Sequence, residues 1–272
     1  MKVILSRKGF DSKFGGYPSP ILLDGTLLSL PIPDENDKVT YKQLFYEGKT
    51  YAQIIAELTK GKFSHTNCHL DPDIRLNDLD ISPAPFDWKP AFGQSGIART
   101  HLEKQKIKEN DLFLFFGFFR EAEEIDSKYQ YVKGSKPKHI IWGYLQIGEI
   151  ILMPTKEKYP WLGMGMHPHL DRNDKPNNTI FVASDTLTWD KNKSGAGTLK
   201  YSPELVLTKE GLSCSHWQLP DFLKDIEISY HSKESWTENY FQSASIGQEF
   251  VIAADGNEEV EKWAKDLIIK GQ

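Results

Sequence analysis

Two long apolar runs constrain the fold of this chain more than any other feature of its sequence. Residues 111–120 and 139–152 are both rich in large hydrophobic side chains, and the stretch between them is strongly charged. A nearly continuous apolar run of this kind is typical of a strand that is buried on both faces. We therefore expect these two segments to be central strands of a sheet, joined by an exposed linker over 121–138.

Shorter patterns predict the remaining elements. One helix is expected over 51–59, capped by Thr50, and a second over 95–106. A third is expected at the carboxyl terminus, where apolar residues recur at helical spacing from Val260 to Ile268. Asp255 and Glu258 match a capping box at the start of this third helix. Further strands are expected at 2–6, 39–46, 179–183, 199–207 and 248–254, with a hairpin over 21–30 that turns at Asp24-Gly25, and a long loop at 63–90.

These elements together indicate the fold class. The expected strands outnumber the helices and are not regularly separated by them, which favours an α+β fold with a mixed, mostly antiparallel sheet and a few flanking helices. We find no repeat and no shift in composition that would mark a boundary, so we expect a single domain over residues 1–272.

Charge and composition exclude several classes of protein. A formal net charge of -5 argues against a generally basic protein that coats nucleic acid. Cys68 and Cys214 are too few for a disulfide framework, so reduced thiols in the cytoplasm are expected. The amino-terminal apolar run is too short for a signal peptide, and no stretch approaches the roughly 18 apolar residues of a membrane helix.

The first candidate site follows the amino-terminal strand. Ser6, Arg7, Lys8, Gly9 and Gly16 place a hydroxyl group, two cations and two flexible glycines around a single turn. Converging backbone N–H groups and a bidentate guanidinium suit a phosphate or carboxylate ligand. The alternative is a surface loop with solvated cations, because the spacing matches neither a Walker P-loop nor the GxGxxG motif.

A second candidate site combines an imidazole with two carboxylates. His69, Asp71 and Asp73 alternate, so in an extended segment they would project to one side. Such a set suits general acid–base catalysis or a divalent cation, whereas Asp-Pro-Asp is also common turn chemistry. We assign Asp71 and Asp73 catalytic roles and assign no metal.

A third candidate site lies at the start of the helix expected at 95–106. Gln94 and Ser95 follow a glycine and precede the helix, where free N–H groups could bind an anion and the amide could read a base. His101 lies on the body of the same helix and is a candidate proton carrier, although a lone helical histidine is usually structural.

Two further patterns are weaker. His167 and His169 alternate and could bind a metal, but Pro168 and the neighbouring glycines indicate an exposed loop. Cys214 and His216 would share a face of a strand, yet no third group that would orient the histidine can be identified.

Several blocks of the sequence resemble the nucleotide modification associated domain 3 family. The similar segments are Ser6-Arg7-Lys8-Gly9-Phe10-Asp11 with Gly15-Gly16, Leu30-Pro31-Ile32-Pro33, His69-Leu70-Asp71-Pro72-Asp73, Gly93-Gln94-Ser95-Gly96, 141–148 and 247–250. The resemblance covers nearly the whole chain. It implies a bacterial or phage system linked to DNA-base modification, and it supplies a context without a defined reaction.

The resemblance leaves three hypotheses. The first is an enzyme that binds a nucleotide or a DNA base through the anion loop and uses Asp11, Asp71, Asp73 or His101 in catalysis. The second is a non-catalytic reader of a modified base, because the strands at 111–115 and 141–144 are also similar to those of PUA- and EVE-type barrels.

In the reader, Trp142 and Tyr144 would stack on the base. The third hypothesis is a structural subunit of a DNA-modification system. We favour the enzyme, with a nucleotide or nucleic-acid base as partner, DNA as a further candidate partner, and cofactor and oligomeric state undefined. An enzyme should gather Arg7, Asp11 and one of the other acidic or histidine residues in one cleft, whereas a reader should have an aromatic pocket.

Overall fold

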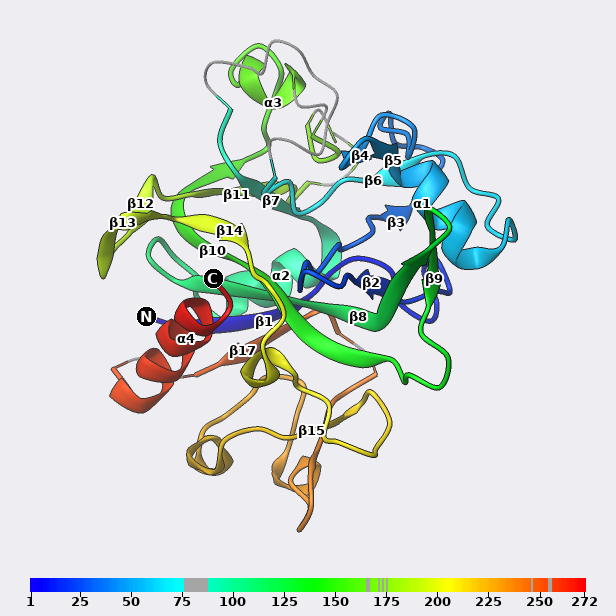
Figure 1. Ribbon diagram of the computed structural model, residues 1–272. Coiled ribbons are helices and arrows are strands. Elements are labelled where there is room, and N and C mark those ends of the chain that lie inside the picture. Colours follow the sequence, from blue (N-terminus) through cyan, green and yellow to red (C-terminus); the bar gives the residue numbers. More distant parts are fainter. Residues whose placement is uncertain are drawn as a thin grey trace.

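The computed structural model describes residues 1–75, 88–164, 167–170, 172, 174, 176–245, 247–253 and 256–272. Within these ranges the largest sheet has nine strands and runs in the order β17-β1-β8-β10-β11-β7, with β2 and β9 paired to β8 and β14 paired to β10 (Figure 1). Its strands are β1 (Val3–Arg7), β2 (Ser19–Ile21), β7 (Ala91–Gln94), β8 (Leu112–Ile125), β9 (Lys128–Tyr131), β10 (Lys138–Leu152), β11 (Thr179–Ala183), β14 (Ala196–Thr198) and β17 (Glu249–Ile252).

The pairing of these strands confirms the predicted α+β class. β8 runs parallel to β1 and β2 and antiparallel to β9 and β10, and the other pairs in the sheet are antiparallel. β8 and β10 are the long central strands that their apolar runs predicted. Phe113, Phe115 and Phe116 on β8 and Ile141 on β10 are fully buried in the main core.

Shorter elements surround the sheet. Four two-stranded ribbons pair β3 (Ile32–Pro33) with β6 (Cys68–His69), β4 (Phe45–Tyr46) with β5 (Lys49–Thr50), β12 (Thr186–Leu187) with β13 (Asp190–Ser194), and β15 (His216–Trp217) with β16 (Phe241–Gln242) in the described part of the chain. The α-helices are α1 (Tyr51–Thr59), α2 (Gly96–Lys104), α3 (Pro160–Met164) and α4 (Glu258–Lys270), and the 3-10 helices are η2 (Pro203–Leu205), η3 (Asp221–Asp225) and η4 (Lys233–Ser235).

Helix termini follow the local sequence closely. Thr50 caps α1, as the sequence predicted, and the structure adds a capping box with Gln53. Asn257 caps α4, its side chain accepting hydrogen bonds from the N–H groups of Glu259 and Val260, and the predicted cap Asp255 lies outside the described residues. α4 lies beside β1, and the two chain ends are close together (Figure 1), where the amino terminus contacts Glu261 Oε1 at 2.8 Å.

Three predicted elements were wrong in part. The charged linker at 121–138 is largely a hairpin, because β8 continues to Ile125 and turns into β9 through Asp126 and Ser127 at positive φ. The strand expected at 199–207 contains η2, which begins at Pro203, and proline favours the first turn of a helix. Of the strand expected at 39–46, only Phe45–Tyr46 forms.

Candidate functional site

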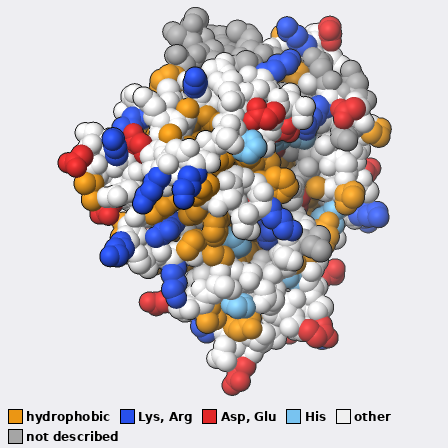
Figure 2. Space-filling view, turned by 90° about the vertical axis from the view of Figure 1, so that its right-hand side faces the viewer, with side chains coloured by type: hydrophobic (Ala, Val, Ile, Leu, Met, Phe, Trp, Pro, Cys, Tyr) orange, Lys and Arg blue, Asp and Glu red, His pale blue; other side chains and the backbone are white. Residues whose placement is uncertain are grey.

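A cavity of about 450 Å³ opens beyond the carboxyl end of β1. Six segments line it: the loop after β1, the chain around β3, the chain around β6, the end of β7, the segment around His169, and the turn before β17. The lining residues are Arg7, Lys8, Gly9, Asp11, Lys13, Phe14, Ile32, Asp34, His69, Asp71, Gln94, Ser95, His169, Arg172, Ser245, Gly247 and Gln248. On the face shown in Figure 2, Lys and Arg side chains gather with histidine atoms exposed between them, although the chain as a whole is acidic.

Curvature of the sheet brings the lining segments together. Ser6 on β1 lies opposite Glu249 on β17, while β7 and β17 stand at opposite ends of the strand order. Even so, Gln94 Nε2 on β7 donates a hydrogen bond to Glu249 Oε1 at 2.8 Å. Side chains of the two end strands therefore meet beside the cavity, although the strands themselves do not pair.

A buried ion pair forms one wall of the cavity. Lys8 Nζ lies 3.0 Å from Glu249 Oε1, and both side chains are almost fully buried. The ammonium group also lies 4.4 Å from the centre of the Phe92 ring. Much of the Lys8 charge is thus balanced inside the protein.

Arg7 is also engaged by the protein. Its Nη2 donates to the carbonyl oxygen of Ala244 at 2.8 Å, and its guanidinium carbon lies 5.7 Å and 5.8 Å from the centres of the Phe116 and Phe250 rings. Burial lowers the pKa of Arg7, against the opposing effects of Asp11 and Glu249. Arg7 is therefore a half-buried residue at a strand end, and the exposed loop cation expected from the sequence was wrong.

The opposite wall carries His69, whose ring is fixed from behind. Its Nδ1 lies 2.5 Å from Asp37 Oδ2. A carboxylate oxygen accepts a hydrogen bond, so Nδ1 is the donor to Asp37 and Nε2 is the ring nitrogen left on the side of Asp71. That Nε2 faces Asp71 Oδ2 at 3.9 Å.

Asp71 is fixed in the same way. Its Oδ1 accepts a hydrogen bond from the N–H of Gly93 at 2.7 Å. Burial raises the pKa of Asp71 to about 6, although His69, Lys8 and the Gly93 hydrogen bond oppose this effect. One carboxylate oxygen is thus held by the backbone while the other faces the imidazole of His69.

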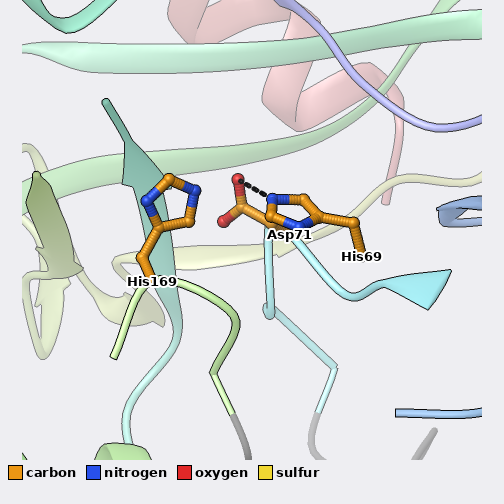
Figure 3. A group of neighbouring side chains, drawn as sticks. All are labelled: His69, Asp71 and His169. Carbon is orange, nitrogen blue, oxygen red and sulfur yellow. Dashed lines mark ion pairs between the residues drawn. The ribbon is translucent and has the colours of Figure 1, made fainter. Parts of the chain in front are cut away.

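His169 completes the group. Its Nδ1 lies 2.7 Å from Asn178 Oδ1, and Asn178 Nδ2 donates to the carbonyl oxygen of His169, which fixes the orientation of the amide. His169 Nδ1 is therefore the donor, and Nε2 keeps its lone pair. Figure 3 shows the Asp71 carboxylate between the two imidazole rings. One potential ligand atom from each of the three residues lies within 4.8 Å of the other two.

Two neighbours support this arrangement. A Cβ on Gly93 would lie 2.3 Å from the His169 ring, so only glycine leaves room for the imidazole there. His167 Nδ1 accepts a hydrogen bond from His169 N at 3.2 Å, and its buried Nε2, 3.8 Å from Asp71 Oδ1, has no hydrogen-bond partner in the described structure. Burial lowers the pKa of His167 to about 3 and that of His169 to about 2, so both rings are neutral near pH 7.

Comparison with known proteins places the chain in a family. The family model for nucleotide modification associated domain 3 matches residues 2–253. The chain belongs to this family. No curated protein and no solved structure matches it. Membership of the nucleotide modification associated domain 3 family associates the chain with nucleotide modification, as the resemblance implied. No helix in the described ranges is long and apolar enough to cross a membrane.

The structure brings together seven of the residues that the sequence proposed for this family member. They are Arg7, Lys8, Gly9, Asp11, Asp71, Gln94 and Ser95. Besides Arg7, Lys8 and Asp71, two more of the seven already have partners. Asp11 Oδ1 accepts the N–H groups of Lys13 and Phe14, and the Gln94 amide is bonded at both ends, to Glu249 and to the N–H of Ser95. Their roles toward a ligand stay predictions.

Four proposed residues do not line this cavity. Ser6 is buried beside Glu249, and Gly16 lies in the turn after β1. Asp73 forms a bridge to Ala91, with Trp88 Nε1 donating to its Oδ2 at 3.2 Å, so it does not join Asp71 on the side facing the cavity.

His101 lies elsewhere. Its Nε2 is 3.0 Å from Ser229 Oγ, and its ring packs on Tyr230 beside a separate cavity. The start of α2 is also less open than expected, because Asn177 Oδ1 accepts the N–H of Gly96 at 2.7 Å.

Sequence reasoning missed His169 and its supporting residues Asn178 and Asp37. The alternation of His167 and His169 was noted, but Pro168 and the glycines indicated an exposed loop, and that expectation was wrong because both rings are buried. His169 is 100 residues from His69, so no local spacing could show that they meet. Cys214 is half-buried, and burial raises the pKa of its thiol to about 11, which disfavours a nucleophilic thiolate.

Proposed function

We propose that this protein binds a phosphate-bearing nucleotide in the cavity beyond β1 and acts on it. One observation carries the proposal: the cavity is lined by cationic side chains (Arg7, Lys13 and Arg172) and also by His69, Asp71 and His169. Lys13 and Arg172 offer charge-assisted hydrogen bonds to phosphate oxygens, whereas Arg7 is already bonded to Ala244. The imidazoles and the carboxylate offer groups that can act on the rest of the ligand.

The size of the cavity supports a small ligand. Its volume of about 450 Å³ lies within the range of roughly 300–1,000 Å³ that is usual for small-molecule sites. Membership of a nucleotide-modification family directs the choice of ligand toward a nucleotide or a base within DNA. The cavity also meets the expectation for an enzyme, since it gathers Arg7, Asp11 and Asp71.

The reader hypothesis receives less support. Trp142 and Tyr144, which were expected to stack on a base, are only 2% and 3% exposed and belong to the main core. Phe14 is the one Phe, Tyr or Trp side chain that lines the cavity in the described structure. The strand order is also open, in contrast to the PUA- and EVE-type barrels to which two strands are similar.

Thermal unfolding with added nucleotides tests the proposal. Deoxynucleoside mono- and triphosphates would be screened against the wild type, and a ligand at 100 times its dissociation constant should stabilise the fold by about 2.7 kcal/mol. Lys13→Ala and Arg172→Ala should each weaken binding roughly 10-fold, the scale of a lost charged hydrogen bond. Lys133→Ala, an exposed lysine outside the cavity, is the control. Equal affinities for all four proteins, or no stabilisation by any nucleotide, would reject the proposal.

A further inference from the structure

We propose that His69, Asp71 and His169 form a binding site for a divalent transition-metal ion at the wall of the cavity. The three ligand atoms are His69 Nε2, Asp71 Oδ2 and His169 Nε2. This inference goes beyond the proposed function, because it stands on side-chain geometry whether or not a nucleotide binds.

The two imidazoles are held in the tautomer that a metal requires. Each Nδ1 hydrogen is directed to an oxygen acceptor, Asp37 for His69 and Asn178 for His169. In metal sites the histidine nitrogen that is not a ligand usually donates to a carboxylate or carbonyl in this way. With Nδ1 of each ring engaged, Nε2 is the nitrogen that each histidine has left for a metal ion.

The carboxylate is arranged as a ligand that binds through one oxygen. Gly93 holds Oδ1, so Oδ2 is the atom available on the side of His69. An ion about 2.1 Å from each donor requires donors roughly 3.0–3.5 Å apart. The separation of 3.9 Å between His69 Nε2 and Asp71 Oδ2 exceeds this by less than about 1 Å, and the ligand atoms of all three residues lie within 4.8 Å of one another.

Ligand type and position define the class of ion. Two imidazole nitrogens and one carboxylate oxygen favour zinc, iron, cobalt, nickel or manganese over calcium and magnesium, which prefer oxygen alone. Three protein ligands leave further coordination positions, and all three residues line the cavity. A site with open positions is typical of a catalytic centre, whereas structural zinc sites are closed by four protein ligands.

A second group shares His69 and must be separated from the first. Asp34, Asp37 and His69 also lie within reach of a common ion. However, Asp34 Oδ1 already accepts hydrogen bonds from the backbone and side chain of Asn36, and Asp37 is occupied by His69 Nδ1. In our assignment Asp37 orients His69, and Asp34 has no role in metal binding.

Metal titration of the stripped protein tests the site. After chelator treatment, Co²⁺ would be followed by its visible absorption and Zn²⁺ by calorimetry, with no nucleotide present. We expect one equivalent to bind. Asp71→Asn and His169→Gln should each weaken binding by at least about 100-fold, and Asp37→Asn by roughly 10- to 100-fold through loss of orientation.

The controls are a carboxylate that lines the same cavity and an exposed histidine outside its lining. Asp34→Asn and the exposed His65→Gln should bind within about threefold of the wild type, which is the change expected where no ligand is lost. Asp71→Asn keeps an acceptor for Gly93, so it gives a folded variant if His169→Gln unfolds, as circular dichroism would show. No bound equivalent in the wild type, unchanged affinity in Asp71→Asn, or loss of binding in Asp34→Asn would overturn the assignment.

Discussion

The polar side chains on the two walls of the cavity differ in how many of their hydrogen-bonding atoms are already used within the protein. On the wall formed by the end of β1, Lys8 pairs with Glu249 and Arg7 donates to Ala244, so both cations are already bonded to groups of the protein. On the facing wall, His69 and His169 are tied through Nδ1 and keep Nε2 free toward Asp71.

This difference shows which side chains still have an atom available to bind a ligand. A cation beside a glycine turn suggests an anion site in sequence, yet a buried cation needs a partner and finds one in the fold. An imidazole has two nitrogens, so one can be fixed while the other stays available. The wall that carries His69 and His169, here called the histidine wall, therefore has more atoms available for a ligand than the β1 wall.

The largest expected effect comes from breaking the ion pair on the β1 wall. Lys8→Met should destabilise the fold by about 3–5 kcal/mol, because it leaves the buried Glu249 charge without its partner. Chemical denaturation measures this change. The double variant Lys8→Met/Glu249→Gln should lose less than the single variant, and a larger loss in the double variant would contradict the assignment of a dominant ion pair.

A smaller loss of stability is expected when a larger side chain is placed against the histidine wall. Gly93→Ala places a Cβ against the His169 ring and should cost about 1–3 kcal/mol, the usual range for overpacking. It should also weaken Co²⁺ binding, because the ring must move. Gly134→Ala, at an open turn position, is a control for the metal titration. Unchanged metal affinity in Gly93→Ala would show that the ring position does not matter.

The pH dependence of stability probes the interior behind the β1 wall. Burial, aided by Arg7, lowers the pKa of His139 to about 3, and this neutral ring accepts a hydrogen bond from Trp217 Nε1. The unfolded pKa is about 6.5, so this contribution is complete above pH 6.5 and declines as pH falls toward 3, by up to about 1.4 kcal/mol per pH unit.

The difference in stability between the wild type and His139→Gln isolates this contribution. That difference should shrink as the pH is lowered from 7 to 5, because the wild type alone must keep the His139 ring neutral. Denaturation at each pH gives the measurement. A constant difference across this range would show that His139 is not held neutral by the fold.

The smallest expected effect on stability is that of replacing Lys13, in contrast to Lys8. Lys13 is exposed at the cavity, so Lys13→Ala should change stability by no more than about 0.5 kcal/mol while reducing nucleotide affinity. Thermal unfolding with and without nucleotide separates the two effects. A large stability loss in this variant would place Lys13 among the structural cations with Lys8.

The sequence by itself determined the central strands, several element boundaries and the family. Apolar runs marked β8 and β10, and Thr50 marked the start of α1. A helix cap depends on residues that are neighbours in sequence, and a buried strand is marked by its run of apolar residues. The pattern along the chain is therefore sufficient to predict both. The sequence also named Asp71, which lies in the His69–Asp71–His169 group.

Only the tertiary structure decided which polar groups are available to a ligand. Arg7 and Lys8 looked like free cations until β17 and the segment before it brought Glu249 and Ala244 beside them. His169 looked exposed until Asn178 and Gly93 enclosed it. The physical reason is that hydrogen bonds and ion pairs act over a few ångströms between residues that can be any distance apart in the chain. Partners separated by 100 residues or more become visible only when the sheet has curved to bring them together.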